Sequence, residues 1–245
     1  MMTTLTRKQR EVQERELRLL EVARKMLIEH GFAGLNMDEI ARATEYSKGT
    51  VYGHFSSKED LVTALAIQSM EQRLRLFELA FRFEALPRER MLAIGFADEL
   101  FVRLHPSYFQ SELVIKMANL KSRVSQERTE ILEKLDQQCF SFLMRIIEEA
   151  VERGDLKFAE PSQPADLVFA LFALAIGSST VIMNFCPLLE KFKIADPFAS
   201  LRQNAQLLLD GFAWKPLRSE WNYASTYQRI ATELFPDECQ RVDLG

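Results

Sequence analysis

The chain has 245 residues, of which 47% are hydrophobic and 27% are charged, a composition typical of a globular protein with a sizeable core. Its nine glycines and eight prolines argue against a loop-rich or mostly β architecture, and its formal charge of −4 excludes a uniformly basic protein. Any binding to nucleic acid would therefore depend on a local basic surface.

The sequence shows no sign of export, membrane insertion or metal binding. No apolar run approaches the roughly 18 residues of a membrane span, and the first ten residues lack the apolar core of a signal peptide. We therefore expect a cytoplasmic protein. Three isolated cysteines and three scattered histidines lack the spacing of a disulfide framework or a metal site, and no catalytic or dinucleotide-binding fingerprint occurs. We expect no enzyme, no metal and no cofactor.

The N-terminal part is expected to be an arm followed by a helix. Residues 1–10 are polar and read as a flexible arm that carries Arg7, Lys8 and Arg10. Residues 11–30 place apolar side chains at helical spacing with charges between them. Gly31 suits the left-handed position that closes a helix.

Residues 36–60 contain three helix starts in quick succession. The expected N-caps are Asn36 with Glu39, Ser47, and Ser57 with Asp60. Only residues 44–46 separate the first two helices, which is too short for anything but a tight turn. Two short helices joined so closely must cross steeply, as they do in a helix-turn-helix DNA reader.

Beyond this stretch the apolar spacing predicts only helices, so the expected fold class is all-α. The predicted helices span residues 57–83, 88–104, 108–121, 125–153, 167–185, 197–212 and 219–235. The helix over 167–185 is apolar almost all round and is expected to be buried on every face. Gly177, Ser178 and Ser179 would let another helix approach it closely.

Residues 47–61, SKGTVYGHFSSKEDL, resemble the DNA-binding signature of the TetR family of transcriptional regulators. Upstream residues match the family's first two helices, so that the resemblance covers roughly residues 15–65. It implies an arm and a three-helix DNA-binding domain over residues 1–60, with the helix-turn-helix motif at about 38–57. It also implies an all-helical ligand-binding and dimerisation domain over residues 61–245.

The resemblance implies that the second helix of the motif enters the major groove. The DNA-binding residues would be Ser47, Lys48, Gly49, Thr50, Tyr52, His54 and Lys58, with Arg7, Lys8 and Arg10 of the arm. Tyr52, His54 and Lys58 would hold phosphates, while the first residues of the helix reach base edges. The alternatives are an amphipathic helix with a surface histidine and, for the arm, a merely solvated terminus.

Two residues in the turn depart from the family pattern. Glu45 stands where the family usually has glycine, and a left-handed backbone there would cost roughly 1–2 kcal/mol. Its negative charge close to DNA should also weaken nonspecific affinity. Tyr46 replaces a small aliphatic residue and is expected to pack between helices, with a phosphate contact as the alternative.

For the rest of the chain the resemblance implies a homodimer and a small-molecule pocket. The apolar helices over 165–185 and 197–212 are the expected dimer interface. Candidate pocket residues are Phe96, Phe101, Phe109, Met117, Phe140, Phe142, Phe172 and Met183. The alternative for most of them is ordinary core packing. If a pocket exists, a hydrophobic or amphipathic ligand is expected.

We therefore predict a transcriptional regulator, a ligand-released repressor that binds a palindromic operator as a dimer. Two alternatives remain open. One is a TetR-fold DNA-binding protein with an architectural or cell-division role and no ligand. The other is a helical interaction module or enzyme that carries the same N-terminal DNA-binding domain, residues 1–60, called the head below. No role follows from the sequence for residues 216–245.

Overall fold

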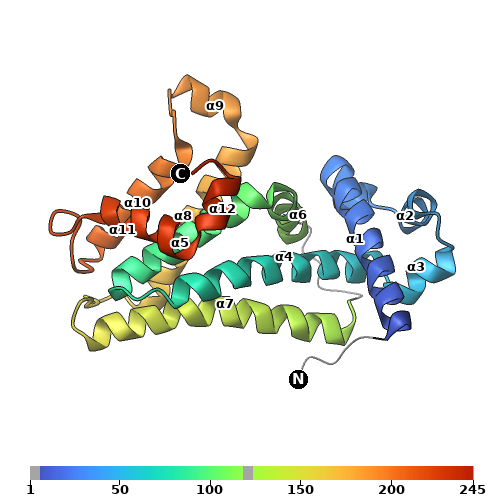
Figure 1. The fold of residues 1–245 in the computed structure, drawn as a ribbon, viewed down its shortest axis with the longest axis horizontal. Coiled ribbons are helices and arrows are strands. Elements are labelled where there is room, and N and C mark those ends of the chain that lie inside the picture. The colour runs from blue at the N-terminus through green and yellow to red at the C-terminus, as the bar shows by residue number, and fades with distance from the viewer. Residues whose placement is uncertain (1–5, 118–123, 245) are drawn as a thin grey trace. The chain divides into compact units, whose positions relative to one another are not determined.

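The computed structural model describes residues 6–117 and 124–244, and all of the regular elements in these ranges are helices (Figure 1). They are α1 (Arg7–Gly34), α2 (Met37–Thr44), α3 (Lys48–His54), α4 (Lys58–Phe81), α5 (Pro87–Leu104), α6 (Pro106–Met117), α7 (Gln126–Glu152), α8 (Pro164–Asn184), α9 (Cys186–Lys191), α10 (Pro197–Gly211), α11 (Tyr223–Arg229), the π-helix η1 (Ile230–Leu234) and α12 (Pro236–Arg241). The all-α expectation is confirmed. The chain divides into two compact units, residues 1–71 with 107–136 and residues 72–106 with 137–245.

The boundaries of several predicted helices agree closely with the structure. Helices α4, α5, α7 and α10 begin and end within two residues of the expected positions. The helix expected over 108–121 is observed as α6 up to Met117, and residues 118–123 lie outside the described part of the chain. The first unit therefore contains α6 and the first turns of α7 as well as the expected head.

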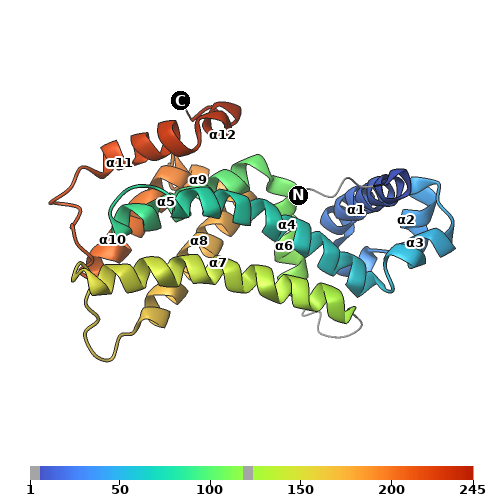
Figure 2. The ribbon, with the colours of Figure 1, turned by 60° about the horizontal axis from the view of Figure 1, so that its bottom comes forward.

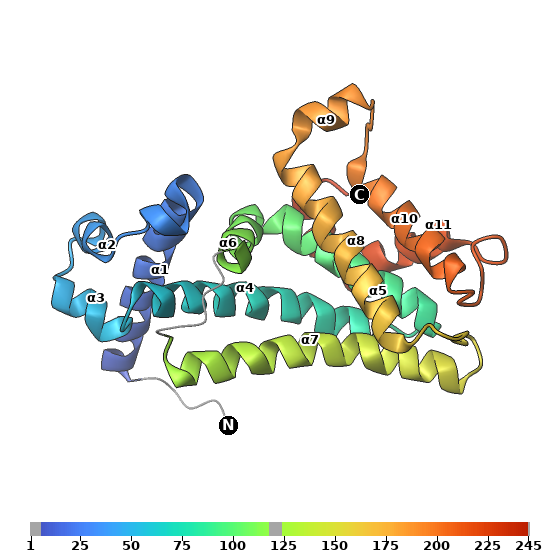
Figure 3. The same ribbon diagram turned by 180° about the vertical axis from the view of Figure 1, so that it is seen from behind.

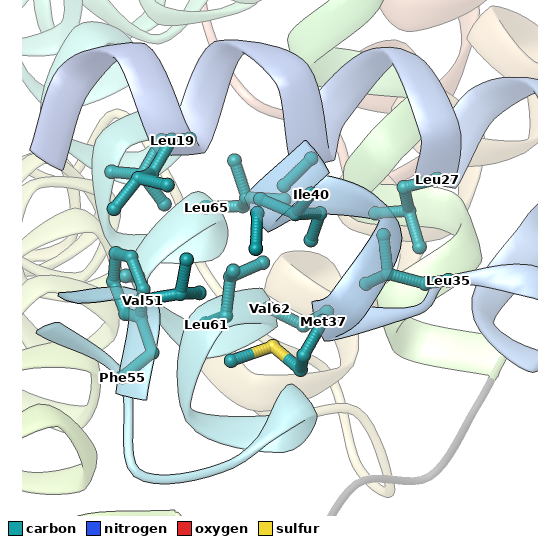
Figure 4. Packing of buried hydrophobic residues seen from close by; sticks show 14 residues of the cluster. Leu19, Leu27, Leu35, Met37, Ile40, Val51, Phe55, Leu61, Val62 and Leu65 are labelled. Carbon is teal, nitrogen blue, oxygen red and sulfur yellow. The ribbon is translucent and has the colours of Figure 1, made fainter. Parts of the chain in front are cut away.

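An apolar cluster holds α1 to α4 of the first unit together (Figure 4). Its labelled members are Leu19 and Leu27 of α1, Leu35 before α2, Met37 and Ile40 of α2, Val51 of α3, Phe55 after α3, and Leu61, Val62 and Leu65 of α4. Burying each larger side chain contributes about 1.5–3 kcal/mol. The two short helices α2 and α3 thus depend on packing rather than on their own length.

Helix α1 begins earlier than expected. Thr6 and Gln9 form a capping box, and Arg7 pairs with Glu11 at 2.8 Å one turn later. Residues 7–10 are therefore helical, and the expectation of a flexible arm is wrong for them. Near the other end, Gly31 has φ 67° and ψ −179°, a conformation essentially restricted to glycine, and one further turn follows before Leu35.

The three expected cap residues each accept a hydrogen bond from a helix amide, while Asp60 accepts its return bond from the amide of Ser56 rather than that of Ser57. The side-chain oxygens of Asn36, Ser47 and Ser57 accept hydrogen bonds from the amides of Asp38 (2.9 Å), Thr50 (3.0 Å) and Asp60 (2.9 Å). In the turn between α2 and α3, Glu45 is left-handed, with φ 60° and ψ 24°. Tyr46 is partly buried against the apolar cluster, which confirms the packing expectation.

A buried arginine of α1 connects α4 and α6 within the first unit. Arg24 of α1 is 6% exposed and donates to Gln68 Oε1 of α4 at 2.7 Å and to Ser111 Oγ of α6 at 3.2 Å. Its guanidinium also lies 3.5 Å from the ring centre of Tyr108 in α6. Desolvation of the arginine is thus offset by directed contacts to two helices.

Helix α5 is the centre of the second unit, and α8, α10, α11 and α12 pack against it (Figure 2). It buries charged side chains together with apolar ones. Their partners come from other elements: Asp98 with Arg73 (2.7 Å), Glu99 with Arg202 (2.6 Å), Glu89 with Thr226 (2.6 Å) and Arg88 with Asp210 (2.7 Å).

The C-terminal segment is not the single helix expected over 219–235. Asn222 caps α11, so the helix begins at Tyr223, and it widens into the π-helix η1 before Pro236 starts α12. The amide of Phe235 donates to the carbonyl of Ile230 at 3.3 Å, the spacing of a π turn. Both side chains are fully buried, and Phe235 contacts Phe96 of α5.

Helix α8 is far more exposed than expected. Phe169 is 71% exposed, and only 17% of the helix's most apolar window is buried within the chain. By length and composition α8 could cross a membrane, with a mean hydropathy of 2.0, so the expectation that no run approaches a span was wrong. Asp166 is its sole charged residue. Figure 3 shows α9 at the tip of the connection from α8 to α10. The expectation that α8 is buried on every face is therefore wrong within a single chain.

Candidate nucleic-acid interface

The N-terminal turn of α3 presents the residues expected to read bases. Ser47 Oγ lies 2.8 Å from Thr50 Oγ1, in addition to capping the helix. Lys48 extends from the first position and pairs with Asp38 of α2 at 2.5 Å. A Cβ added to Gly49 would meet its nearest neighbour, Ser47 Oγ, only at 3.7 Å. The packing of the chain itself therefore leaves room at Gly49.

Of the expected phosphate contacts, Tyr52 and His54 lie in different surroundings. Tyr52 is 50% exposed on α3. The side chain of His54 is only 9% exposed, and its Nδ1 lies 3.5 Å from Glu16 Oε2 of α1. His54 is therefore not the surface histidine that was the alternative to DNA contact, and most of its imidazole is covered by the chain.

Lys58, at the start of α4, has its ammonium group engaged with α1. Its Nζ donates to the carbonyl oxygens of Phe32 (2.7 Å) and Ala33 (3.5 Å) and lies 4.3 Å from the ring centre of Phe32. The C-terminal end of a helix favours such a cation, because its last carbonyls lack helical partners. A phosphate at α4 would have to share or displace this contact.

An open recess lies beside these residues. Its volume is about 660 Å³, and its lining residues are Met37, Tyr52, Ser56, Ser57, Lys58, Glu59, Val124 and Ser125. Polar and apolar groups thus meet beside α3. Within the described ranges, no group of three or more His, Cys, Asp or Glu side chains is arranged to hold a metal ion.

Cations on α1 were partly expected and partly missed. Arg7, Lys8 and Arg10 are exposed in the first turn of α1. Arg15 and Arg18 were not singled out from the sequence, yet their guanidinium groups lie 5.8 and 5.7 Å from the ring centre of Tyr46. The unusual tyrosine of the turn is the signal that could have indicated them, because aromatic faces attract arginine.

The candidate pocket residues belong to both compact units and have different aromatic neighbours. In the first unit Phe109 is buried, and the side chain of Met117 lies outside the described part. In the second unit Phe140 and Phe172 form a ring pair at 6.3 Å. The others have separate neighbours: Phe96 contacts Tyr227 and Phe235, Phe101 contacts His105, Phe142 contacts Phe81, and Met183 is half-buried.

Known proteins resemble the chain over both the head and most of its length. Residues 19–65 match the family described as bacterial regulatory proteins, tetR family. The HTH-type transcriptional regulator UidR of Escherichia coli strain K12 is 30% identical over 152 residues, which make up 60% of this chain and 72% of UidR.

Solved structures share the fold at lower identity. A tetR-family regulatory protein from Rhodococcus RHA1 aligns with a TM-score of 0.65 at 18% identity, covering 82% of this chain and 97% of that one. A structure of AibR in complex with isovaleryl coenzyme A and operator DNA aligns with a TM-score of 0.59 at 20% identity, covering 81% of this chain and 98% of AibR.

Proposed function

Because the chain belongs to the TetR family of bacterial regulatory proteins, we propose that it is a ligand-released repressor that binds a palindromic operator as a homodimer. It is a DNA-binding transcriptional regulator, and it acts in the cytoplasm. Residues 1–60 form the DNA-binding domain, and residues 61–245 form the ligand-binding and dimerisation domain. A ligand bound in the second domain moves α4 and changes the distance between the two heads.

The observation that carries the DNA-binding role is the exposed, capped first turn of α3. Lys48 and Thr50 extend from this turn, and Gly49 leaves its backbone uncovered. The chain's own packing does not require a glycine there, whereas close approach to base edges does. Tyr52, His54 and Lys58 hold phosphates, the last two after leaving the contacts that they make in the free protein.

An exposed apolar stripe supports the homodimer. Phe169, Ala173 and Gly177 follow one another at spacings of four residues on α8, and all are exposed. Open space surrounds Gly177, which permits close approach of a second helix. Leu207 on the neighbouring α10 is 46% exposed. A second copy of the same surface would bury both helices of each chain in a four-helix interface.

The effector is proposed to be a hydrophobic or amphipathic small molecule. AibR, which shares the fold, was solved with isovaleryl coenzyme A, a thioester with an apolar acyl group. In this chain the ring pair of Phe140 and Phe172 is the partly open aromatic site among the candidate residues, at 45% and 42% exposure. An acyl group is the kind of ligand that such rings would cover.

Selection of binding sites from genomic fragments, with the full chain at low salt, tests the function. We expect a palindrome whose half-sites are about one helical turn, roughly 34–36 Å, apart.

Tyr52→Phe and His54→Ala should then weaken binding to all sequences alike, whereas Lys48→Ala and Thr50→Ala should alter base preference. If no palindromic DNA is retained, the regulator proposal is rejected. If the Tyr52→Phe, His54→Ala double variant binds as tightly as the parent, only the phosphate assignment is rejected.

Sedimentation of the purified chain tests the dimer. Phe169→Asp places a charge in the apolar stripe of α8 and should shift the chain to monomers at micromolar concentration. Leu79→Asp is the matched control, because Leu79 is an exposed leucine of α4, at 41% exposure, outside the stripe. Equal sedimentation of both variants and the parent would reject the proposed interface.

A further inference from the structure

The start of α7 contacts segments on either side of α3, the helix proposed to enter the major groove. Ser125, before the first residue of α7, and Arg128, in its first turn, contact α1, the end of α3 and the start of α4. These contacts lie within the first compact unit. They join residues more than sixty positions apart in the sequence, since Arg128 is 68 residues from Asp60.

Asp60 is the acceptor at the centre of this cluster. Its side chain is 2% exposed, and both of its carboxylate oxygens accept hydrogen bonds from the start of α7. One oxygen accepts from the amide of Ser56 at 3.0 Å and from Arg128 Nη1 at 2.7 Å. The other accepts from the amide of Ser125 at 3.2 Å and from its hydroxyl at 2.8 Å. The carboxylate therefore joins the turn after α3 to the start of α7.

Arg128 extends the same connection to α3 itself. Its Nη2 donates to the carbonyl oxygen of His54, the last residue of α3, at 3.1 Å. This carbonyl is one of the helix's unpaired terminal acceptors. The guanidinium carbon also lies 4.9 Å from the ring centre of Phe55, which is fully buried in the apolar cluster, and Nη2 lies 3.5 Å from Glu16 of α1.

We propose that Arg128 is a positioning residue for operator recognition, which holds the C-terminal end of α3 against Asp60 and makes α7 a second helix, besides α4, that acts on the head. The proposal rests on the proposed function, because it concerns how α3 is presented to DNA. Helix α7 continues without a break from Gln126 to Glu152, and residues 137–152 belong to the second compact unit. Within the first unit, the position of the first turn of α7 acts on His54 and Phe55 directly through Arg128.

The geometry favours an arginine over a simple charge. The planar guanidinium donates in fixed directions, so that its two terminal nitrogens reach Asp60 and the His54 carbonyl together while its face covers Phe55. A lysine at this position would keep the charge but could not direct donors to both acceptors at once. Arg128→Lys therefore separates directed contact from charge.

Titration of DNA binding tests the proposal with Arg128→Gln, Arg128→Lys and the matched control Lys134→Gln, which removes one positive charge from an exposed position of the same helix. The two probes are the duplex obtained by genomic selection and a scrambled duplex of equal length. Arg128→Gln should lower affinity for the selected duplex by about ten-fold or more. Its affinity for the scrambled duplex should match that of Lys134→Gln, and Arg128→Lys should fall between the parent and Arg128→Gln.

Hydrogen exchange of the full chain without DNA supplies a readout that does not depend on the operator. Arg128→Gln should speed exchange of the amides at residues 51–57 and leave those of α2 unchanged. Ser125→Ala, which removes one donor to Asp60 without changing any charge, should act in the same direction and serves if Arg128→Gln does not fold. If the parent selects no DNA, the proposed function fails while the exchange experiment still decides the attachment. If the parent binds, and Arg128→Gln equals Lys134→Gln in both duplex affinities and in exchange, the positioning role is overturned.

Discussion

In the first unit the recognition helix rests on a cluster of apolar side chains from α1 to α4, whereas in the second unit the central helix α5 buries Arg88, Glu89, Asp98 and Glu99. The first arrangement is held by contacts without direction, which tolerate small changes of shape. The second depends on hydrogen bonds and ion pairs with defined geometry. A single substitution should therefore lower the stability most where it removes a buried charge of α5.

The charged groups of α5 also determine which segments surround it. Arg88, which is fully buried, donates to Asp210 at 2.7 Å, to Gln206 Oε1 at 2.9 Å and to the carbonyl of Trp214. These acceptors lie on or just after α10. An unpaired buried charge costs more free energy than a lost apolar contact. Removing one partner of the contact between α5 and α10 should therefore destabilise the fold strongly.

The largest expected effect follows from removing Arg88. Arg88→Ala should lower the free energy of unfolding by about 3–5 kcal/mol, because the buried oxygens of Gln206 and the carbonyl of Trp214 lose a donor and Asp210 loses its nearest cation. Ile40→Val in the apolar cluster of the head should cost about 0.5–1.5 kcal/mol. Urea unfolding of both variants measures this contrast between the two units.

Arg75→Ala is the matched control, since Arg75 is an exposed arginine of α4. Its effect should stay within about 0.5 kcal/mol. If Arg88→Ala costs no more than Ile40→Val, the buried charges of α5 do not hold the second unit together in the way argued above.

A smaller effect is expected from acid at Asp60, a buried charged side chain of the first unit. Burial raises the pKa of Asp60, but the hydrogen bonds from Ser125, Ser56 and Arg128 outweigh it and lower the pKa from 3.8 to about 2. The folded form thus binds this proton less well than the unfolded form. The resulting stability, on the order of 2 kcal/mol, is fully present above about pH 4 and is lost as the pH falls toward 2.

Thermal unfolding of the parent and Asp60→Asn between pH 2 and 7 checks this prediction. The parent should be the more stable at pH 7, and the difference should shrink as the pH falls toward 2, because Asp60 becomes increasingly protonated over this range. A difference that stays constant over this range would show that Asp60 is not held as a carboxylate by these hydrogen bonds.

The same comparison explains what could be predicted from the sequence. The helix starts at Asn36, Ser47 and Ser57 were predictable because a cap and its amide lie within three residues of each other. The attachment of Arg128 to Asp60 and that of Arg88 to Asp210 were not, since 68 and 122 residues separate the partners and no local pattern marks either pair.

Exposure was the other property that the sequence did not reveal. The apolar pattern of α8 was read as burial on every face, yet the chain leaves Phe169 exposed. Periodicity reports that a face avoids water but not which molecule covers it. For His54 and Lys58 the resemblance to the TetR family implied contacts with DNA, while the contacts with Glu16 and with the end of α1 came from the tertiary fold.

The smallest expected effect concerns Glu45, a non-glycine residue whose backbone is left-handed at φ 60°. Glu45→Gly should remove a strain of roughly 1–2 kcal/mol, but the glycine also adds freedom to the unfolded chain, which returns about half of that gain. Glu45→Ala keeps a Cβ and therefore keeps the strain. We expect Glu45→Gly to be the more stable by about 1 kcal/mol in urea unfolding.

Both Glu45 variants remove the same exposed charge, so both should bind a scrambled duplex more tightly than the parent, and equally so. Equal stability of the two would mean that the turn is unstrained, whereas unequal nonspecific affinity would mean that the backbone of the turn, and not only its charge, faces the DNA.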